Sequence, residues 1–249
     1  MSLKKFLFSS VSNVLYELGS STKVGGIARE MGCSSVLVVT DPGVHKLGLT
    51  DGVVESASKA GLKVSVYDKV KEDPPESTVL DLVHFAKVRL EAGDRISDDF
   101  YCQSHGVDGV VGVGGGSSMD AAKVAAFLCG DTRQRLEEVY GVGLTQGRRL
   151  PLIQVPTTSG TGSEVTNISV ITTGQAEKKG VVGPQLYADY AVLDGDLTLS
   201  LPPAVTAATG IDAMVHAIEA FTSKHLKNVL SDLLAVEALR LLSSNIRLS

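Results

Sequence analysis

The stretch Val111 to Lys123, with the sequence VGVGGGSSMDAAK, decides the fold predicted for this chain of 249 residues. The mostly apolar run Val107 to Val113 leads into it, and a composition that favours helix follows from Asp120 onwards. This order predicts a buried strand, a glycine turn and the start of a helix. Three consecutive glycines carry no side chains, so backbone N–H groups there can approach a bulky ligand closely.

The start of this predicted helix is suited to an anion. Ser117 and Ser118 stand where a helix N-terminus presents unpaired N–H groups and the positive end of its dipole, which favours a phosphate. The alternative is that the glycines only form a tight turn between a strand and a helix. The cluster alone leaves both interpretations open, and the downstream sequence favours the ligand site.

Composition excludes two classes of partner. A hydrophobic content of 43% with 20% charged residues is ordinary for a globular protein with one large or two modest domains. The net charge of -5 supplies no basic field, which disfavours nucleic acid as a partner. No apolar run approaches membrane-spanning length, so we expect no membrane partner.

Cysteine usage bears on the compartment. The three cysteines (Cys33, Cys102 and Cys129) are odd in number, far apart and without metal-ligand spacing, which favours a reducing compartment. We therefore predict a cytoplasmic protein. An organellar presequence is the alternative, because residues 1–12 contain no acidic side chain.

The N-terminal part predicts a β-α-β unit of a parallel sheet, with strands at Ser34–Thr40 and Lys63–Asp68 and a helix at Leu49–Ala60. Asp41 ends the first of these strands. A carboxylate there can accept hydrogen bonds from the ribose hydroxyls of adenosine and repels a 2′-phosphate. The alternative is a turn in which Asp41 is the capping acceptor, and taken alone that alternative is favoured.

The segments around this unit are less informative. Ser77 is the predicted cap of a helix over Val79–Leu90, and Glu91–Gln103 is an elaboration without a functional signature. We predict a polar connection over Asp131–Arg149 and a charged turn over Gln175–Lys179.

The second informative stretch is Pro156–Thr166, with the sequence PTTSGTGSEVT. Five Ser or Thr residues between Thr157 and Ser163 offer many hydrogen-bond donors and no charge, which suits a cofactor or a polar substrate. A solvated linker is the alternative. It is less favoured because predicted strands flank the stretch closely at Leu152–Val155 and Ile168–Ile171.

The last predicted strand is Tyr190–Asp194, and beyond Leu201 the periodicity becomes helical. We place a domain boundary near Leu197, which separates an α/β part, residues 1–197, from a helical part, residues 198–249. The predicted helices of this second part are Val205–Thr209, Asp212–Phe221 and Val229–Leu242.

Asp212 and His216 lie four residues apart, on one face of a predicted helix. A carboxylate oxygen and an imidazole nitrogen can then reach one cation, and this donor set suits Fe(II), Zn(II) or Mn(II). The alternative is a surface Asp–His pair worth roughly 0.2–0.5 kcal/mol. Without other evidence that alternative is favoured, because two ligands do not make a tight site.

Taken together, four segments in this order resemble the iron-dependent (group III) alcohol dehydrogenase family. The resemblance covers nearly the whole chain, and the hydroxyl-rich and Asp/His segments are its specific parts. It implies a dehydroquinate-synthase-like fold, in which residues 1–197 form an α/β dinucleotide-binding domain and residues 198–249 the first part of an all-helical, metal-binding domain. The active site would lie between the two domains. The segments are VLVVTDPG at Val36–Gly43, GGGSSMDAAK at Gly114–Lys123, the stretch Pro156–Thr166, and GIDAMVHAIEA at Gly210–Ala220.

The resemblance also implies cofactors and roles: NAD, Fe(II) with Zn(II) as the alternative, a small alcohol or aldehyde as substrate, and a homodimer. Asp41 would hold the ribose and favour NAD over NADP, while Asp212 and His216 would be two metal ligands. The remaining implied contacts are Gly115, Gly116, Ser117 and Asp120 at the pyrophosphate, and Thr157, Thr158, Thr161, Thr166 and Lys178 at the nicotinamide half.

In such enzymes two further metal-binding histidines and a proton-relay histidine lie further along, so we expect a C-terminally truncated chain without a catalytic residue of its own. His225 is predicted to be solvated. A second hypothesis is therefore an NAD-binding remnant without turnover, or a module that pairs with longer subunits. A third, a relative of dehydroquinate synthase or glycerol dehydrogenase, is disfavoured by the hydroxyl-rich segment.

Overall fold

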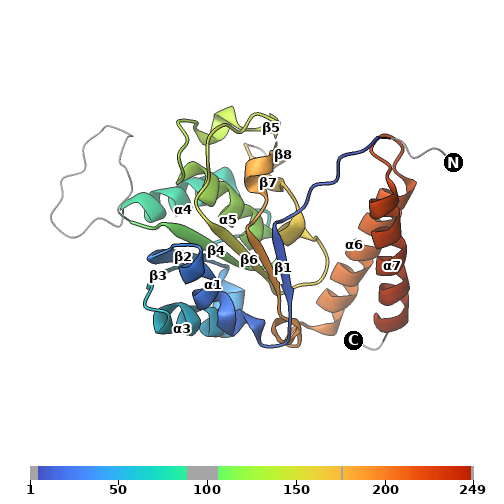
Figure 1. Ribbon diagram of the computed structural model, residues 1–249, viewed down its shortest axis with the longest axis horizontal. Coiled ribbons are helices and arrows are strands. Elements are labelled where there is room, and N and C mark those ends of the chain that lie inside the picture. Colours follow the sequence, from blue (N-terminus) through green and yellow to red (C-terminus); the bar gives the residue numbers. More distant parts are fainter. Residues whose placement is uncertain (1–4, 89–105, 175, 248–249) are drawn as a thin grey trace.

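The computed structural model describes residues 5–88, 106–174 and 176–247. Within them, six strands form a sheet whose neighbouring strands pair in parallel (Figure 1). The order across this sheet is β1 (Asn13–Tyr16), β9 (Tyr190–Leu193), β6 (Leu152–Pro156), β4 (Gly109–Gly114), β2 (Ser35–Val39) and β3 (Lys63–Tyr67). A smaller sheet has the order β5 (Gly141–Val142), β8 (Glu177–Val182) and β7 (Ile168–Thr173).

Helices cover both faces of the large sheet (Figure 1). On β2, Val36 and Val38 belong to one buried cluster and Leu37 and Val39 to the other, as the alternation of side chains along a strand requires. The central strands β4 and β6 are buried at every residue, which explains their nearly continuous apolar sequences. The first face carries α1 (Val24–Glu30) and α3 (Asp51–Lys59), and the second carries α4 (Glu76–Val88) and α5 (Gly116–Leu128).

The parallel arrangement brings three chain segments to one edge of the sheet. Val39 of β2 pairs with Gly112 of β4, and Gly114 of β4 pairs with Pro156 of β6. The carboxyl ends of these strands therefore lie next to one another. The segments that leave them are the short helix α2 (Pro42–Lys46), α5 and the hydroxyl-rich loop, which we define as residues 157–166.

The C-terminal part consists of two long helices that lie side by side, α6 (Pro203–Thr222) and α7 (Val229–Asn245) (Figure 1). The two helices predicted over residues 205–209 and 212–221 are wrong, because α6 is continuous. Gly210 does not break it; a Cβ there would lie 2.7 Å from Ile246 Cδ1, so this glycine allows the end of α7 to pack closely.

Three further local predictions are wrong. Ser77 is the second residue of α4 and not its cap, since α4 begins at Glu76. The predicted turn over residues 175–179 contains the start of β8, because the charged sequence Glu-Lys-Lys belongs to a strand whose first two residues are exposed. The predicted connection over residues 131–149 contributes β5, and β1 was not predicted at all. The elaboration over residues 91–103 lies outside the described residues. In the described part of the chain, no helix is long and apolar enough to cross a membrane.

Candidate cofactor and metal site

The glycine turn, residues 114–116, joins β4 to α5 at the carboxyl edge of the sheet. Gly114 has a φ of 146°, and a Cβ at this position would lie 2.7 Å from Ser118 Oγ, so only glycine fits. Gly115 is the N-cap of α5, and no side chain of the described residues caps it. The first N–H groups of this 13-residue helix are thus available for an anion.

Asp41 faces the glycine turn from the end of β2. Its Oδ1 accepts hydrogen bonds from the N–H groups of Gly43 (2.9 Å) and Val44 (3.0 Å), so it caps α2. Its Oδ2 accepts a bond from Ser118 Oγ at 3.2 Å. The interpretation of Asp41 as a capping acceptor is confirmed, and the contact with an adenosine ribose stays a prediction.

The hydroxyl-rich loop lies directly against the glycine turn. Three of its threonines each lie beside one of the three glycines, and the tightest side-chain contact is at Gly116. The Thr157 N–H donates to the Gly114 carbonyl at 3.0 Å, Thr158 Oγ1 would lie 3.6 Å from a Cβ at Gly115, and Thr161 Cγ2 would lie 3.0 Å from a Cβ at Gly116. The structure therefore brings together the predicted pyrophosphate and nicotinamide contacts.

Lys123 is a central residue of this region, although the sequence pattern does not predict a role for it. Its side chain is fully buried, and its Nζ donates to Ser163 Oγ (2.7 Å), Thr166 Oγ1 (3.1 Å) and the Ile168 carbonyl (2.7 Å). Burial lowers the pKa of Lys123, and the carboxylate of Asp120 opposes that effect. The available signal is a lysine between two pairs of apolar residues, one turn after Asp120 in the same helix.

Asp120 is also held by internal contacts. Its Oδ1 accepts from Ser163 Oγ at 2.6 Å, and its Oδ2 accepts from the N–H of Val170 at 2.8 Å. The carboxylate thereby fastens the hydroxyl-rich loop and β7 to α5, and its predicted contact with a pyrophosphate stays a prediction. Burial raises the pKa of the neighbouring Glu164, and Lys123 is among the groups that oppose this rise.

Lys178 approaches the glycine turn through a second residue that was not predicted. Its Nζ lies 2.7 Å from Asp73 Oδ1, and the Asp73 N–H donates to Ser117 Oγ at 3.2 Å. Both charged side chains are more than half exposed. Lys178 therefore lies beside the turn, held by Asp73.

Asp212 and His216 lie on one face of α6, with 3.6 Å between Asp212 Oδ2 and His216 Nε2. Two ligand atoms that each sit about 2.0–2.2 Å from a zinc ion in tetrahedral geometry are separated by roughly this distance. The pair therefore fits two neighbouring positions around a metal ion. The described residues contain no group of three or more His, Cys, Asp or Glu that could complete the site, and His225 is exposed.

The metal pair and the hydroxyl-rich loop belong to adjoining elements. A Cβ at Gly160 would lie 2.9 Å from Thr209 Cβ and 3.0 Å from the Thr209 carbonyl oxygen, so the loop contacts the backbone of α6. Thr209 precedes Asp212 by three residues, about one helical turn. The loop thus links the glycine turn to the helix that carries Asp212 and His216.

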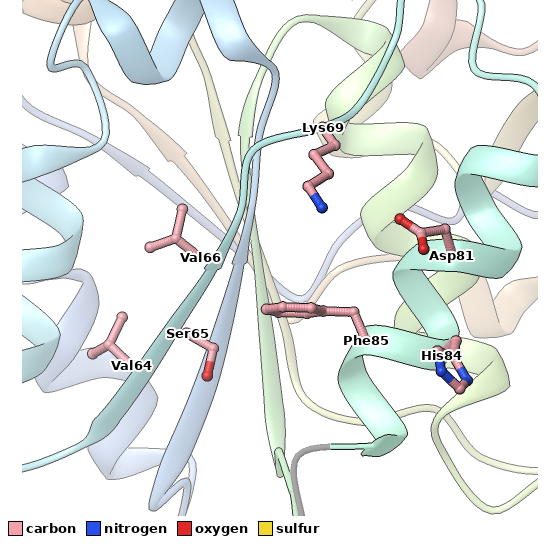
Figure 2. Close-up of a pocket in the computed structure, with 7 residues that line it drawn as sticks. All are labelled: Val64, Ser65, Val66, Lys69, Asp81, His84 and Phe85. Atoms are coloured by element: carbon pink, nitrogen blue, oxygen red, sulfur yellow. The ribbon is translucent and has the colours of Figure 1, made fainter.

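A separate pocket of about 430 Å³ lies between β3 and α4. Figure 2 shows the side chains that line it, which include Lys69, Asp81 and His84. None of the residues predicted for a cofactor or a metal lines this pocket.

A parallel sheet with a glycine turn and an open helix N-terminus at its carboxyl edge is the arrangement that dinucleotide-binding α/β proteins use. Residues 12–195 match the family described as iron-containing alcohol dehydrogenase, and residues 206–249 match the C-terminal part of the iron-containing alcohol dehydrogenase family. The chain belongs to this family.

Among its relatives, the long-chain-alcohol dehydrogenase 1 of Geobacillus thermodenitrificans is 40% identical over 99% of this chain. The sulfoacetaldehyde reductase of Bilophila wadsworthia is 34% identical over 97% of it. This chain covers 58% of each of these two relatives. The crystal structure of the sulfoacetaldehyde reductase from Bifidobacterium kashiwanohense in complex with NAD+ superimposes on 98% of this chain with a TM-score of 0.84 at 28% identity, and 60% of that protein is covered.

These similarities confirm the predicted fold class, an α/β part with a parallel sheet followed by helices. The dehydroquinate-synthase-like fold expected from the sequence agrees with them. The proposed boundary near residue 197 falls between the two matched regions and stays a prediction.

Proposed function

We propose that this chain carries the NAD site and two metal ligands of a metal-dependent alcohol dehydrogenase, which transfers hydride between a small alcohol or aldehyde and NAD. The observation that carries the proposal is the position of the hydroxyl-rich loop. It is hydrogen-bonded to the glycine turn through Thr157 and packed on α6 through Gly160. A dinucleotide bound along the loop would reach from the open N-terminus of α5 towards Asp212 and His216.

Different residues of the chain bind the two halves of NAD. The N–H groups around Gly115, Gly116 and Ser117 bind the pyrophosphate, and Asp41 accepts from the ribose hydroxyls. Asp120 supports this end from inside the protein. The nicotinamide half lies along uncharged hydroxyls, with Lys178 at its margin; these residues are Thr157, Thr158, Thr161 and Thr166.

Asp212 and His216 serve as ligands of Fe(II), or of Zn(II) as the alternative. The chemistry that such an ion supplies is polarisation of the alcohol oxygen, which eases its deprotonation before hydride transfer. Within this chain, Asp212 and His216 would hold the ion, on the helix that packs against the hydroxyl-rich loop. The substrate class rests on the family, whose members include enzymes named for long-chain alcohols, sulfoacetaldehyde and choline.

Metal and cofactor binding can be separated by substitution. In a form of the protein that retains a metal ion, Asp212→Ala and His216→Ala should abolish metal retention and leave NADH affinity unchanged. The readouts are metal analysis after desalting and the fluorescence of bound NADH. Retention of the metal by both variants would remove Asp212 and His216 from the site.

A second candidate function is an NAD-binding module without turnover. It is favoured by one observation, that the described residues supply only two grouped metal ligands. NADH formation from NAD, 1-butanol and Fe(II) under anaerobic conditions separates the two candidates. Turnover by the 249-residue chain supports the dehydrogenase, and tight NADH binding without turnover supports the module.

We also propose that the protein is a cytoplasmic homodimer. Buried, unpaired thiols at Cys33 and Cys129 support a reducing compartment. The edge strand β1 exposes the apolar side chains of Val14 and Tyr16, which supports association along this edge. Cell fractionation and light scattering test the two statements separately.

A further inference from the structure

Lys123 lies in the middle of α5 with no exposed side-chain surface. A lysine is almost never buried in this way without partners, because desolvation of its charge is costly. An ammonium group has three N–H donors, and Lys123 Nζ has three oxygen acceptors within 3.1 Å. The count of donors matches the count of acceptors.

The surrounding polar groups are satisfied as well. The Ser163 hydroxyl accepts from Lys123 and donates to Asp120 Oδ1 at 2.6 Å. The Thr166 hydroxyl accepts from Lys123 and donates to the Ser163 carbonyl at 3.3 Å. Asp120 Oδ1 lies 3.5 Å from Lys123 Nζ and supplies the opposite charge. A buried network in which every member is paired is rigid, and the loss of one member leaves the others unpaired.

This network joins two segments that are distant in sequence. Lys123 and Ser163 are 40 residues apart; the first belongs to the helix that starts at the glycine turn, and the second to the hydroxyl-rich loop. Ile168, at the start of β7, is anchored to the same nitrogen. Lys123 therefore holds the hydroxyl-rich loop and the start of β7 against α5 from inside the protein, with its side chain fully buried.

We propose that Lys123 is a positioning residue for the cofactor: its ammonium group holds the hydroxyl-rich loop against α5 and so places the loop threonines along the nicotinamide half. Lys123 itself does not contact the cofactor. This inference rests on the proposed NAD site and deepens it.

The proposal predicts different effects on the binding of NADH and of ADP. NADH spans the glycine turn and the loop, whereas ADP reaches only Asp41 and the turn. Lys123→Met keeps most of the side-chain volume and removes the three hydrogen bonds from Nζ, which leaves Asp120 as the remaining polar link between α5 and the loop. We expect NADH affinity to fall about tenfold, the scale of losing hydrogen bonds from a buried charged group, and ADP affinity to change less than about twofold.

The test is calorimetric titration of the 249-residue chain with NADH and, separately, with ADP. The variants are Lys123→Met and Ser163→Ala, and the matched control is Lys59→Met, because the Lys59 side chain is 73% exposed on α3. Ser163→Ala removes one bridging hydroxyl and should weaken NADH about threefold with ADP unchanged. Lys59→Met should change neither affinity.

The outcomes distinguish this inference from the proposed function. If the unsubstituted chain binds neither NADH nor ADP, the NAD site itself is wrong and the role of Lys123 falls with it. Should NADH bind the unsubstituted chain and both variants equally, Lys123 does not position the cofactor while the NAD site stands. Equal losses for NADH and ADP would show a general structural role. If Lys123→Met does not fold, Ser163→Ala decides by the same comparison.

Discussion

At the scale of single residues, Asp41 caps α2 and is the proposed acceptor for the ribose hydroxyls, and a substitution can separate these two roles. We expect Asp41→Asn to raise affinity for NADPH relative to NADH, because it removes the charge that repels a 2′-phosphate and keeps an oxygen that can cap α2. Asp41→Gly should relax the preference in the same direction at a cost of a few tenths of a kcal/mol in cap stability. The measurement is the ratio of dissociation constants for NADH and NADPH. An unchanged ratio in both variants would leave Asp41 with the capping role only.

Asp194 offers a pH-dependent prediction that concerns stability. It is buried at the end of β9 and accepts from the N–H groups of Gly19 (2.8 Å), Ser21 (2.9 Å) and Asp196 (3.2 Å). Burial by itself raises the pKa of Asp194, but a hydrogen bond from the Ser21 side chain together with these backbone hydrogen bonds outweighs burial and holds the pKa below its ordinary value of 3.8. Because the folded-state pKa is the lower one, the stabilisation is complete above pH 3.8 and is lost as the pH falls through the folded-state pKa.

Asp194→Asn should therefore lower the free energy of unfolding at pH 7 by about 1.5–3 kcal/mol, the range for hydrogen bonds to a charged group. The difference from the unsubstituted chain should shrink as the pH falls below about 4. Urea unfolding at several pH values measures it, with the exposed Asp196→Asn as the control. A difference that does not vary with pH would show that the charge of Asp194 is not what stabilises the turn.

Part of this site can be predicted from residue types and from their order along the chain. Asp41 was recognised both as a capping acceptor and as a ribose candidate because it directly follows an apolar strand. Lys123 and Asp73 could not be predicted, because their hydrogen-bond partners Ser163 and Ser117 lie 40 or more residues away in sequence. These residues and their partners come within hydrogen-bond distance only in the folded chain.

At the scale of elements, two neighbouring glycines of α1 allow a matched comparison. A Cβ at Gly25 would lie 2.2 Å from the Ser56 carbonyl oxygen on α3, whereas a Cβ at Gly26 would meet nothing within 4 Å. We expect Gly25→Ala to destabilise the protein by about 1–3 kcal/mol through overpacking against a backbone that cannot yield. Gly26→Ala should be neutral or stabilise by about 0.4–1 kcal/mol.

Thermal or urea unfolding measures the stability of the two variants. Each variant is the control for the other, because both replace a glycine of α1 by alanine. Similar stabilities would mean that α1 and α3 are not in the close contact on which this face of the sheet depends.

The elements predicted from sequence are those with a strong internal pattern. Strands β2, β4 and β6 are buried on both faces, and their apolar runs are visible without any partner. Strands β1 and β5 are short, and β8 begins with two exposed charged residues, so the sequence pattern predicts none of the three. They form through pairing with neighbouring strands. The continuous α6 was divided at Gly210, where the low helix propensity of glycine is outweighed by close packing with α7.

At the scale of the whole molecule, the site depends on the register of three parallel strands. The pairing of Gly114 with Pro156 brings the glycine turn and the hydroxyl-rich loop together, and the contact of Gly160 with Thr209 adds α6. The sequence alone predicted each segment, and only the family resemblance predicted that they share one site. Spacing along the chain carries no information about which strand ends become neighbours.

The Asp212–His216 pair determines how tightly the folded chain can hold a metal ion. Asp212 and His216 present two donor atoms 3.6 Å apart, and the described residues offer no further grouped ligand. A structural zinc site uses four protein ligands and a catalytic one three, so two ligands on a half-exposed helix face should hold Fe(II) weakly.

After anaerobic incubation of the 249-residue chain with Fe(II) and NAD followed by desalting, we expect well below one iron ion per chain, about the same amount as in a His216→Ala variant. Near one iron ion per chain that is lost in the variant would contradict this expectation. It would mean that a second chain or a residue outside the described part completes the site, and that the 249-residue chain is sufficient for the metal centre of a dehydrogenase.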